Sequence, residues 1–219
     1  MNSPLLQLLV LAGIAIFLIL RLKNVLGTRD GFEGPASSKP PVSNRPSREF
    51  EVIEGGPDYD ITDHVEEGSD EAKALAEMKR IEPSFSVTEF LAGARSAYEM
   101  IVMGYERGDL DAIKPFLAED IYESFVEGVA AREDQGLTIE ADFIGVRELK
   151  LMDATFDKDT QEAELTIRFT GELTSEVRNA EGEVVEGSKN EVKRQKDTWS
   201  FARKMGSDDP NWLLVSTDG

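Results

Sequence analysis

The sequence predicts an α+β domain in which helices pack on one face of a curved antiparallel sheet. Apolar residues recur at three- and four-residue spacing through residues 85–135, which is typical of amphipathic helices. After Leu137 they alternate with polar residues, as in strands with one buried face. Because the helices precede the strands, we expect helices on one face of an antiparallel sheet that tapers into a cone with an apolar interior.

The 219 residues suffice for one buried domain with further segments attached, but not for two domains and an anchor. We divide the chain into a transmembrane anchor at 1–26 and an acidic disordered linker at 27–68. The α+β domain follows at 69–219, and it begins with a short helix at 69–82. One folded domain must therefore carry the function.

The apolar run at residues 5–20, interrupted only by Gln7, predicts a transmembrane helix. With the residues up to 26, the helix is long enough to span about 30 Å of hydrocarbon while its flanking basic residues extend outward. The alternative is a cleaved signal peptide. No basic residue precedes Leu5 and no small-residue cleavage site follows Leu20, which favours a retained anchor. The anchor residues are Leu5, Leu6, Leu8, Leu9, Ile14, Ile16, Phe17, Leu18, Ile19, Leu20, Arg21 and Lys23.

Basic residues Arg21, Lys23 and Arg29 all follow the apolar run, and this bias places the flank after the anchor in the cytoplasm. The next segment, 27–68, is rich in Gly, Pro, Ser and acids, so we expect it to bury no core residue and to act as an extended spacer. An acidic docking strip for a basic partner is the alternative.

Ser69 begins a helical pattern that ends before Pro83, with Ala72, Leu75, Ala76 and Ile81 as its apolar stripe. We expect this helix to pack on the domain, with a membrane or a partner helix as alternatives.

The motif Ser86-Val87-Thr88-Glu89 is a capping box, and Phe85 and Phe90 fit a hydrophobic staple around it. The helix that follows ends at Gly108, Asp109 is placed to cap a short second helix, and a third helix runs from Glu119 to Gly136. The third helix should bury Ile121, Tyr122, Phe125, Val126 and Val129. The clear alternation at residues 162–170 predicts a strand, and further strands are expected before and after it. Turns are predicted at 157–159 and 180–182.

Composition excludes several classes of function. The net charge of −19 and the pI near 4.4 argue against direct nucleic-acid binding, because phosphate backbones would be repelled. There is no cysteine, and the single His64 lies among acids and glycines. No metal cluster, phosphate-binding loop or cofactor site is indicated.

The ordered motifs of the domain resemble the C-terminal domain of subunit 44 of the mitochondrial inner-membrane import translocase. The motifs are Phe85-Ser86, Phe90, Ala94, Tyr98, Gly108-Asp109-Leu110, Phe116-Leu117, Tyr122, Trp199-Ser200-Phe201-Ala202-Arg203 and Asp209-Pro210-Asn211-Trp212-Leu213-Leu214. The similarity covers about 69–219. It implies a cone of the nuclear-transport-factor type.

The resemblance also implies a function. The mitochondrial subunit tethers a heat-shock chaperone to a protein-conducting channel, and a related mitochondrial ribosomal protein helps place ribosomes at the membrane. Bacterial relatives with one N-terminal anchor imply a single-pass protein of the bacterial inner membrane, with its N-terminus outside. We expect an adaptor whose partners are the lipid bilayer and a chaperone, translocon or ribosome component. Where the mitochondrial subunit has an extended partner-binding region, we expect a short N-terminal region with an integral helix, so recruitment of a chaperone through it is not implied.

The candidate residues of the cone interior or a partner-binding surface are Tyr98, Ile101, Tyr105, Phe125, Phe169, Trp199, Phe201 and Trp212. The cone could receive a hydrophobic peptide or a lipid tail, or its own side chains could fill it. The enzyme alternative, a cone-fold isomerase or dehydratase, would use Asp142 or Asp153 as base with Tyr98, Tyr105 or Tyr122 as donor, and we favour the adaptor. A basic cluster (Lys189, Lys193, Arg194 and Lys196) either faces an anionic partner or balances neighbouring acids.

Overall fold

The computed structural model describes residues 57–218. The predicted anchor and residues 27–56 of the predicted linker lie outside this range. Within 57–218, no helix is both long enough and apolar enough to cross a bilayer.

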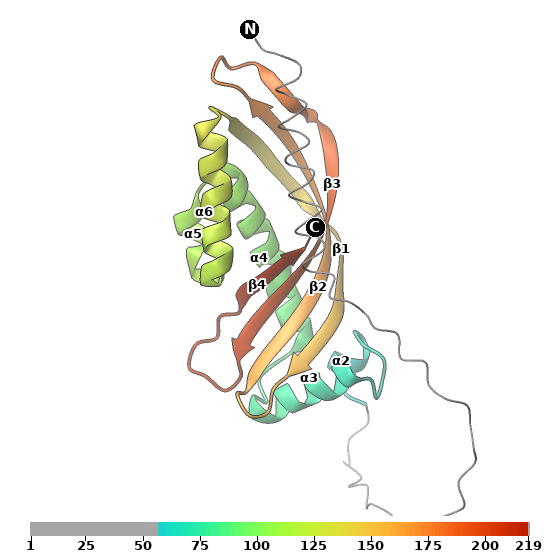
Figure 1. Ribbon diagram of the computed structural model, residues 1–219. Helices are drawn as coiled ribbons and strands as arrows, with labels where there is room; N and C mark the ends of the chain where they lie inside the picture. The colour runs from blue at the N-terminus through green and yellow to red at the C-terminus, as the bar shows by residue number, and fades with distance from the viewer. Residues whose placement is uncertain (1–56, 219) are drawn as a thin grey trace, which may run out of the picture. The chain divides into compact units, whose positions relative to one another are not determined.

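Four antiparallel strands form one sheet in which each strand pairs with its neighbour in sequence. Figure 1 shows that the sheet is strongly curved and that the helices lie on its concave side. The predicted α+β architecture is therefore confirmed, and both predicted turns lie between strands. The strands are β1 (Thr138–Phe156), β2 (Glu162–Arg178), β3 (Val184–Lys204) and β4 (Leu213–Asp218).

The long helix α4 (Val87–Arg107) runs along the concave face and provides most of the helical core. Gly108 ends it in the left-handed conformation, with φ of 71°, as the sequence predicts. Its side chains Tyr98 and Ile101 are fully buried, as are Ile167 and Phe169 on β2. The alternation predicted for β2 thus matches its buried face.

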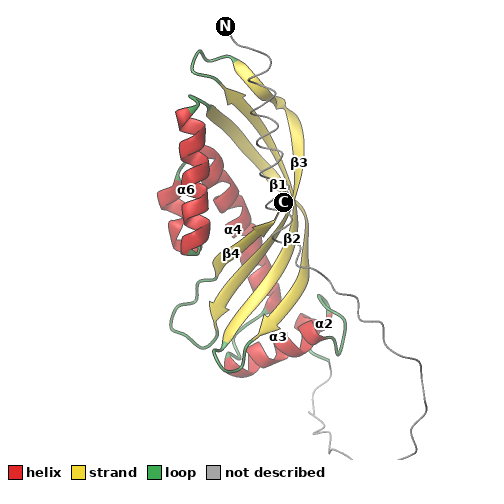
Figure 2. Cartoon of the chain, in the orientation of Figure 1, coloured by secondary structure: helices red, strands yellow, loops and turns green. Residues whose placement is uncertain are grey.

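A second helical layer lies beside α4 and contains α5 (Leu110–Ile113), the 3₁₀ turn η1 (Lys114–Phe116) and α6 (Glu119–Asp134). In Figure 2, α6 lies on the outer side of α4, and the start of α6 meets β4, where the Ala118 N–H donates to the Leu214 carbonyl at 2.9 Å. One prediction fails here and one is met in part. Asp109 is the N-cap residue of α5, but the structure records no hydrogen bond from α5 to its side chain. On α6 only Val129 is buried and Val126 is 38% exposed, while Ile121, Tyr122 and Phe125 are partly buried against the hydrophobic core.

The predicted linker already contains part of the fold. Helix α2 (Tyr59–Thr62) lies at 59–62, and Ile61 joins the hydrophobic core with 5% of its surface exposed. The neighbouring His64 lies 3.3 Å from Thr88 on α4, measured between Nε2 and Oγ1. The expectation that 27–68 buries no core residue is therefore wrong for its last residues.

Asp60 of α2 holds the N-terminus of α4. Its carboxylate accepts hydrogen bonds from the backbone N–H groups of Val87 (2.8 Å) and Thr88 (2.9 Å) and from the Ser86 hydroxyl (3.0 Å). Burial tends to raise the pKa of Asp60, but these hydrogen bonds and the Lys79 ammonium at 2.8 Å hold it well below the ordinary value. A residue 27 positions before the first residue of the helix thus satisfies two of the helix's free backbone N–H donors.

Only half of the predicted capping box forms. The Ser86 hydroxyl accepts from the Glu89 N–H at 3.3 Å, whereas the structure records no return contact from the Glu89 carboxylate. Asp60 occupies that end of the helix instead. The two staple residues, Phe85 and Phe90, are both buried.

Helix α3 (Asp70–Ile81) matches the predicted leading helix and packs on β1. Ser69 caps it by accepting from the Ala72 N–H at 3.1 Å. Leu75 and Met78 are fully buried, whereas Ile81, a predicted stripe residue, is 41% exposed. The buried face of α3 consists of Ala72, Leu75 and Met78, and Ile81 lies beside this face instead of on it.

Candidate functional site

An apolar groove of about 270 Å³ opens between α4, η1 and the connection from β3 to β4. Its walls are mainly aromatic, and small residues of α4 form its floor. The residues that line the groove are Glu89, Phe90, Gly93, Ala94, Ala97, Phe116, Phe201, Pro210, Asn211 and Trp212. We refer to it below as the Trp212 groove.

Small residues on α4 leave the groove open. Gly93 and Ala97 lie one helical turn apart on the same side of α4. A Cβ atom at Gly93 would meet no atom within 4 Å. An apolar side chain of another molecule can therefore approach the α4 backbone closely here.

Trp212 is held by aromatic contacts and by a cation. Its ring centroid lies 4.7 Å from that of Phe90 and 6.0 Å from that of Phe85. The Arg203 guanidinium lies over the ring at 5.4 Å. The wall is thus preorganised, which lowers the entropic cost of binding.

Arg203 is fixed in turn by an ion pair with Glu82, the residue that follows α3. The Arg203 side chain is only 8% exposed, and the Glu82 carboxylate also accepts from the Gly206 N–H at 3.2 Å. The hydrogen bond from Arg203 lowers the pKa of Glu82, against the opposing effect of burial. The ion pair ties α3 to the loop that carries the groove wall.

The domain should lose stability as pH falls below 4.5, the ordinary value for a glutamate. The folded state holds Glu82 ionised, so the unfolded chain binds this proton first, and the stability present above 4.5 is lost on acidification. Urea unfolding between neutral pH and about pH 3 measures how steeply the free energy of unfolding falls with pH. The variant Glu82→Gln should reduce this slope. An identical slope in the variant would show that the ion pair does not contribute.

The concave interior behind the groove is filled by the domain's own aromatic side chains. Tyr98 stacks on Phe169 with ring centroids 4.4 Å apart, and Trp199 lies 4.7 Å from Tyr98. The Tyr98 hydroxyl donates to the Asp197 carboxylate and accepts from Gln195 Nε2 at 3.0 Å. Burial, and then Asp197, raise the pKa of Tyr98 above its ordinary value.

One protein-family model matches most of the described chain. The model described as Tim44-like domain matches residues 71–219, which include α3 from its second residue and every later described element. The chain belongs to the Tim44-like domain family. The resemblance inferred from the ordered motifs is therefore confirmed.

Two curated relatives are translocase subunits. The chain is 26% identical over 147 residues to "Mitochondrial import inner membrane translocase subunit TIM44" of Homo sapiens, covering 66% of this chain and 32% of the relative. It is 20% identical over 161 residues to "Mitochondrial import inner membrane translocase subunit TIM44-1" of Arabidopsis thaliana, covering 71% and 34%. The chain thus spans about a third of the length of these relatives.

Among solved structures, the intermembrane space region of chloroplast protein ARC6 overlaps the chain with a TM-score of 0.40 and 10% identity. The overlap covers 58% of this chain and 94% of that one.

The Tim44-like domain distributes the sequence-predicted candidate residues over three places. Tyr98, Ile101, Phe169 and Trp199 form the core, while Phe201 and Trp212 line the Trp212 groove. Tyr105 and Phe125 pair with each other between α4 and α6, with ring centroids 4.7 Å apart. Sequence reasoning missed Phe116, Gly93 and Ala97 as groove residues. Small residues one turn apart on α4 were the available signal.

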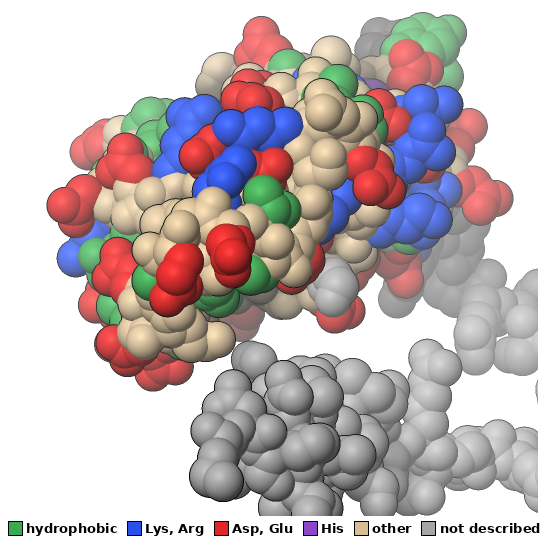
Figure 3. Space-filling model, turned by 90° about the horizontal axis from the view of Figure 1, so that it is seen from above, with side chains coloured by type: hydrophobic (Ala, Val, Ile, Leu, Met, Phe, Trp, Pro, Cys, Tyr) green, Lys and Arg blue, Asp and Glu red, His purple; other side chains and the backbone are tan. Residues whose placement is uncertain are grey.

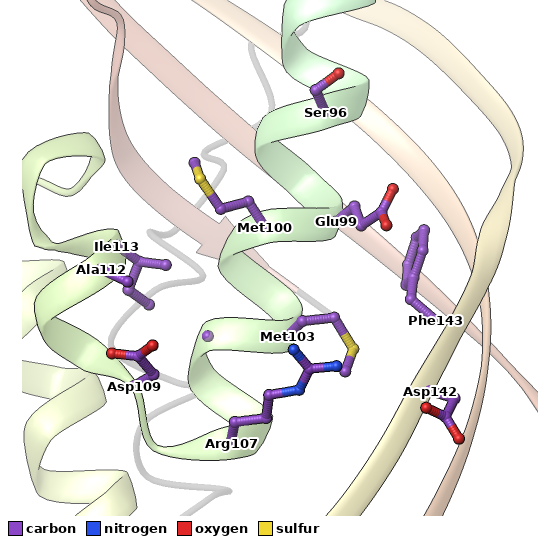
Figure 4. A pocket seen from close by; sticks show the side chains of 11 residues that line it. Ser96, Glu99, Met100, Met103, Arg107, Asp109, Ala112, Ile113, Asp142 and Phe143 are labelled. Carbon is purple, nitrogen blue, oxygen red and sulfur yellow. The ribbon is translucent and has the colours of Figure 1, made fainter.

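A second hollow, of about 490 Å³, lies between α4, α5 and β1 (Figure 4). Met100, Met103 and Phe143 give it apolar walls. Charged side chains also line it, namely Glu99, Arg107, Asp109 and Asp142. Figure 4 shows Asp142 on β1, on the far side of the hollow from Asp109.

The residues of the enzyme alternative are not brought together. Asp142 borders the second hollow, whereas Asp153 accepts a hydrogen bond from the next backbone N–H at 2.9 Å and does not line that hollow. The Tyr98 hydroxyl is buried against Asp197, and Tyr122 lies under the Lys114 ammonium at 4.5 Å. Within residues 57–218, no group of three acidic or histidine side chains could hold a metal ion.

The predicted basic cluster is largely paired. Lys189 binds Glu140, Lys193 binds Glu186 at 3.3 Å, and Arg194 binds Glu172 at 2.7 Å. These acids balance three of its four charges, as one of the two interpretations expected. Among the described residues, no ion pair is recorded for the fourth, Lys196.

Proposed function

We propose that this chain is a membrane-tethered adaptor whose Tim44-like domain binds a protein partner through the Trp212 groove. The supporting observation is an open, preorganised apolar groove on a domain whose interior is already filled. A preformed apolar groove with small residues on its floor suits a partner's apolar side chains. The adaptor acts in the biogenesis, translocation or quality control of membrane proteins.

The curated relatives support this role by their names, which are those of import translocase subunits. The corresponding partner classes for this chain are chaperone, translocon and ribosome components. The predicted helix at residues 5–20 supplies the tether, in a bacterial inner membrane with the domain on the cytoplasmic side. The acidic chain that follows spaces the domain from anionic lipid.

A groove-filling variant tests the binding role. Gly93→Trp places a bulky ring in the groove, where a Cβ has free space, so the domain should fold normally. Partner proteins that co-purify with the full chain from solubilised membranes should fall by about tenfold. Ala92→Trp, on the neighbouring exposed residue of α4, is the matched control and should retain them. Equal recovery with both variants would contradict binding at the groove.

The adaptor role also predicts that the carboxylates of Asp142 and Asp153 are not needed for function. Asp142→Asn and Asp153→Asn should leave growth and partner recovery unchanged, because neither carboxylate lies in the Trp212 groove. An enzyme using either base would lose its activity by about a hundredfold or more in the same comparison. Loss of function in a folded Asp142→Asn protein would favour the isomerase or dehydratase alternative.

The tether has its own test. The full chain should remain in the membrane fraction after alkaline carbonate extraction, because a helix that spans the bilayer is retained where a surface contact is not. Removal of residues 1–26 should release it. If the intact chain washes off, or if its mature form begins after residue 20, the tether is wrong.

A further inference from the structure

The convex face of the sheet carries a strip of basic side chains, of which the sequence pattern revealed only Arg194 and Lys196. On β1 and β2, Leu149 pairs with Phe169 on the helical side, so the next pair, Lys150 and Arg168, points to the opposite, convex side. Across the same face, β3 places Arg194 opposite Glu172 and Lys196 opposite Thr170. We call Arg147, Lys150, Arg168, Arg194 and Lys196 the basic strip.

The acids of the domain neutralise this strip only in part. Arg147 and Arg194 share one carboxylate, that of Glu172, at 3.3 Å and 2.7 Å. Among residues 57–218, no ion pair is recorded for Lys150, Arg168 or Lys196, although the chain carries a net charge of −19. Figure 3 shows that Lys and Arg side chains gather in patches instead of spreading evenly.

The pairing within the strip is itself unfavourable. Lys150 and Arg168 lie directly opposite each other on neighbouring strands, where like charges destabilise a sheet. Glu148 lies on the same face of β1, opposite Thr170, but among residues 57–218 no ion pair is recorded between it and either cation. The two cations are therefore left without a recorded ion-pair partner in the described part of the chain.

A free strand edge runs beside the strip. Strand β4 pairs only with residues 198–202 of β3. Residues 193–197 pair with β2 in unbroken register on one side, and no described strand pairs with them on the other. Backbone N–H and C=O groups along this edge are therefore available to an added strand.

We propose that an extended acidic segment of a protein partner adds to the sheet along residues 193–197, with its carboxylates against Arg194 and Lys196. Successive side chains on one face of a strand lie about 6.7 Å apart, so acids at alternate positions of the partner face the strip together. The inference rests on the proposed adaptor role, but it uses a surface separate from the Trp212 groove.

The charges select this partner over a second copy of the chain. Pairing two β3 edges would place Arg194 and Lys196 of one copy against the same side chains of the other, which repel. Lysines on edge strands commonly block such pairing. The same residues favour a strand with acidic side chains.

The test uses the full chain in nonionic detergent and a fluorescent, end-capped nine-residue peptide with Glu alternating with Val or Thr. Fluorescence anisotropy should show binding that weakens with added salt. Arg194→Glu combined with Lys196→Glu should reduce the affinity by about tenfold or more, while Lys204→Glu, at the exposed far end of β3, should not. A peptide N-methylated at alternate residues should also bind about tenfold more weakly, because its backbone cannot extend the sheet.

Each other outcome would overturn the inference. Equal affinity for the N-methylated peptide would show charge attraction without strand addition. No peptide binding, together with strip-dependent sedimentation with phosphatidylglycerol vesicles, would assign the strip to a lipid surface instead. Gly93→Trp should leave peptide binding intact, so failure at the edge and failure at the Trp212 groove are distinguishable.

Discussion

A fragment that begins at Ser69, the domain boundary expected from composition, should be less stable than one that begins at Pro57 by roughly 2–5 kcal/mol. Burial of the Ile61 side chain contributes about 1.5–3 kcal/mol. Loss of the Asp60 cap at the start of α4 removes about 0.5–2 kcal/mol more. Such a loss is large against the total stability of a domain of this size.

Urea unfolding of the two fragments measures this difference directly. Within the longer fragment, Ile61→Ala should account for most of the loss. Tyr59→Ala, in the same helix but 69% exposed, should change the free energy of unfolding little. Equal midpoints for the two fragments would show that α2 is not part of the folded domain.

Tyr98→Ala should destabilise the domain by about 3–5 kcal/mol, the usual cost of removing a large buried aromatic side chain. Tyr98 is fully buried and stacks on Phe169 beside Trp199. The substitution also leaves the Asp197 carboxylate without the Tyr98 donor. Its effect should exceed that of Gly93→Trp, because a Cβ at position 93 meets no atom within 4 Å.

Two companion variants separate the ring from the hydroxyl. Tyr98→Phe keeps the stacking and should cost about 1–3 kcal/mol, since it removes the donor to Asp197 and the acceptor of the Gln195 amide. Gly171→Ala should also destabilise, because its Cβ would lie 2.6 Å from the Tyr98 hydroxyl oxygen. Thermal unfolding of Tyr98→Ala, Tyr98→Phe and Gly171→Ala ranks the three variants by their loss of stability. If Tyr98→Ala lowered the free energy of unfolding by less than about 1 kcal/mol, this would contradict the role of the Tyr98 ring in the core.

Local periodicity predicted most of the elements. The three- and four-residue spacing located α3, α4 and α6, and the alternation at residues 162–170 located β2, because each pattern depends on near neighbours in sequence. The fold of residues 57–68 could not be predicted in this way. Asp60 and Ile61 stand in an acidic run that is typical of solvated chain, and their partners lie more than 20 residues away.

The candidate site was predicted only in part. The sequence predicted the aromatic residues Phe201 and Trp212 as candidates, and both line the groove. Phe116 reaches it because η1 meets β4, where the Ala118 N–H donates to the Leu214 carbonyl at 2.9 Å. The basic strip was predicted only on β3, where Arg194 and Lys196 stand close in sequence. Arg147, Lys150 and Arg168 lie far from them in sequence, and only the strand register places them on the same face.

Photocrosslinking from inside the Trp212 groove tests the central claim most directly. A benzophenone-bearing amino acid at position 89, an exposed residue that lines the groove without filling it, should form a discrete crosslink to a protein partner when the full chain is in intact membranes. The same residue at position 92, on the adjacent exposed side of α4, should not. Crosslinks of equal intensity from both positions, or from neither, would contradict an adaptor that holds its partner in this groove.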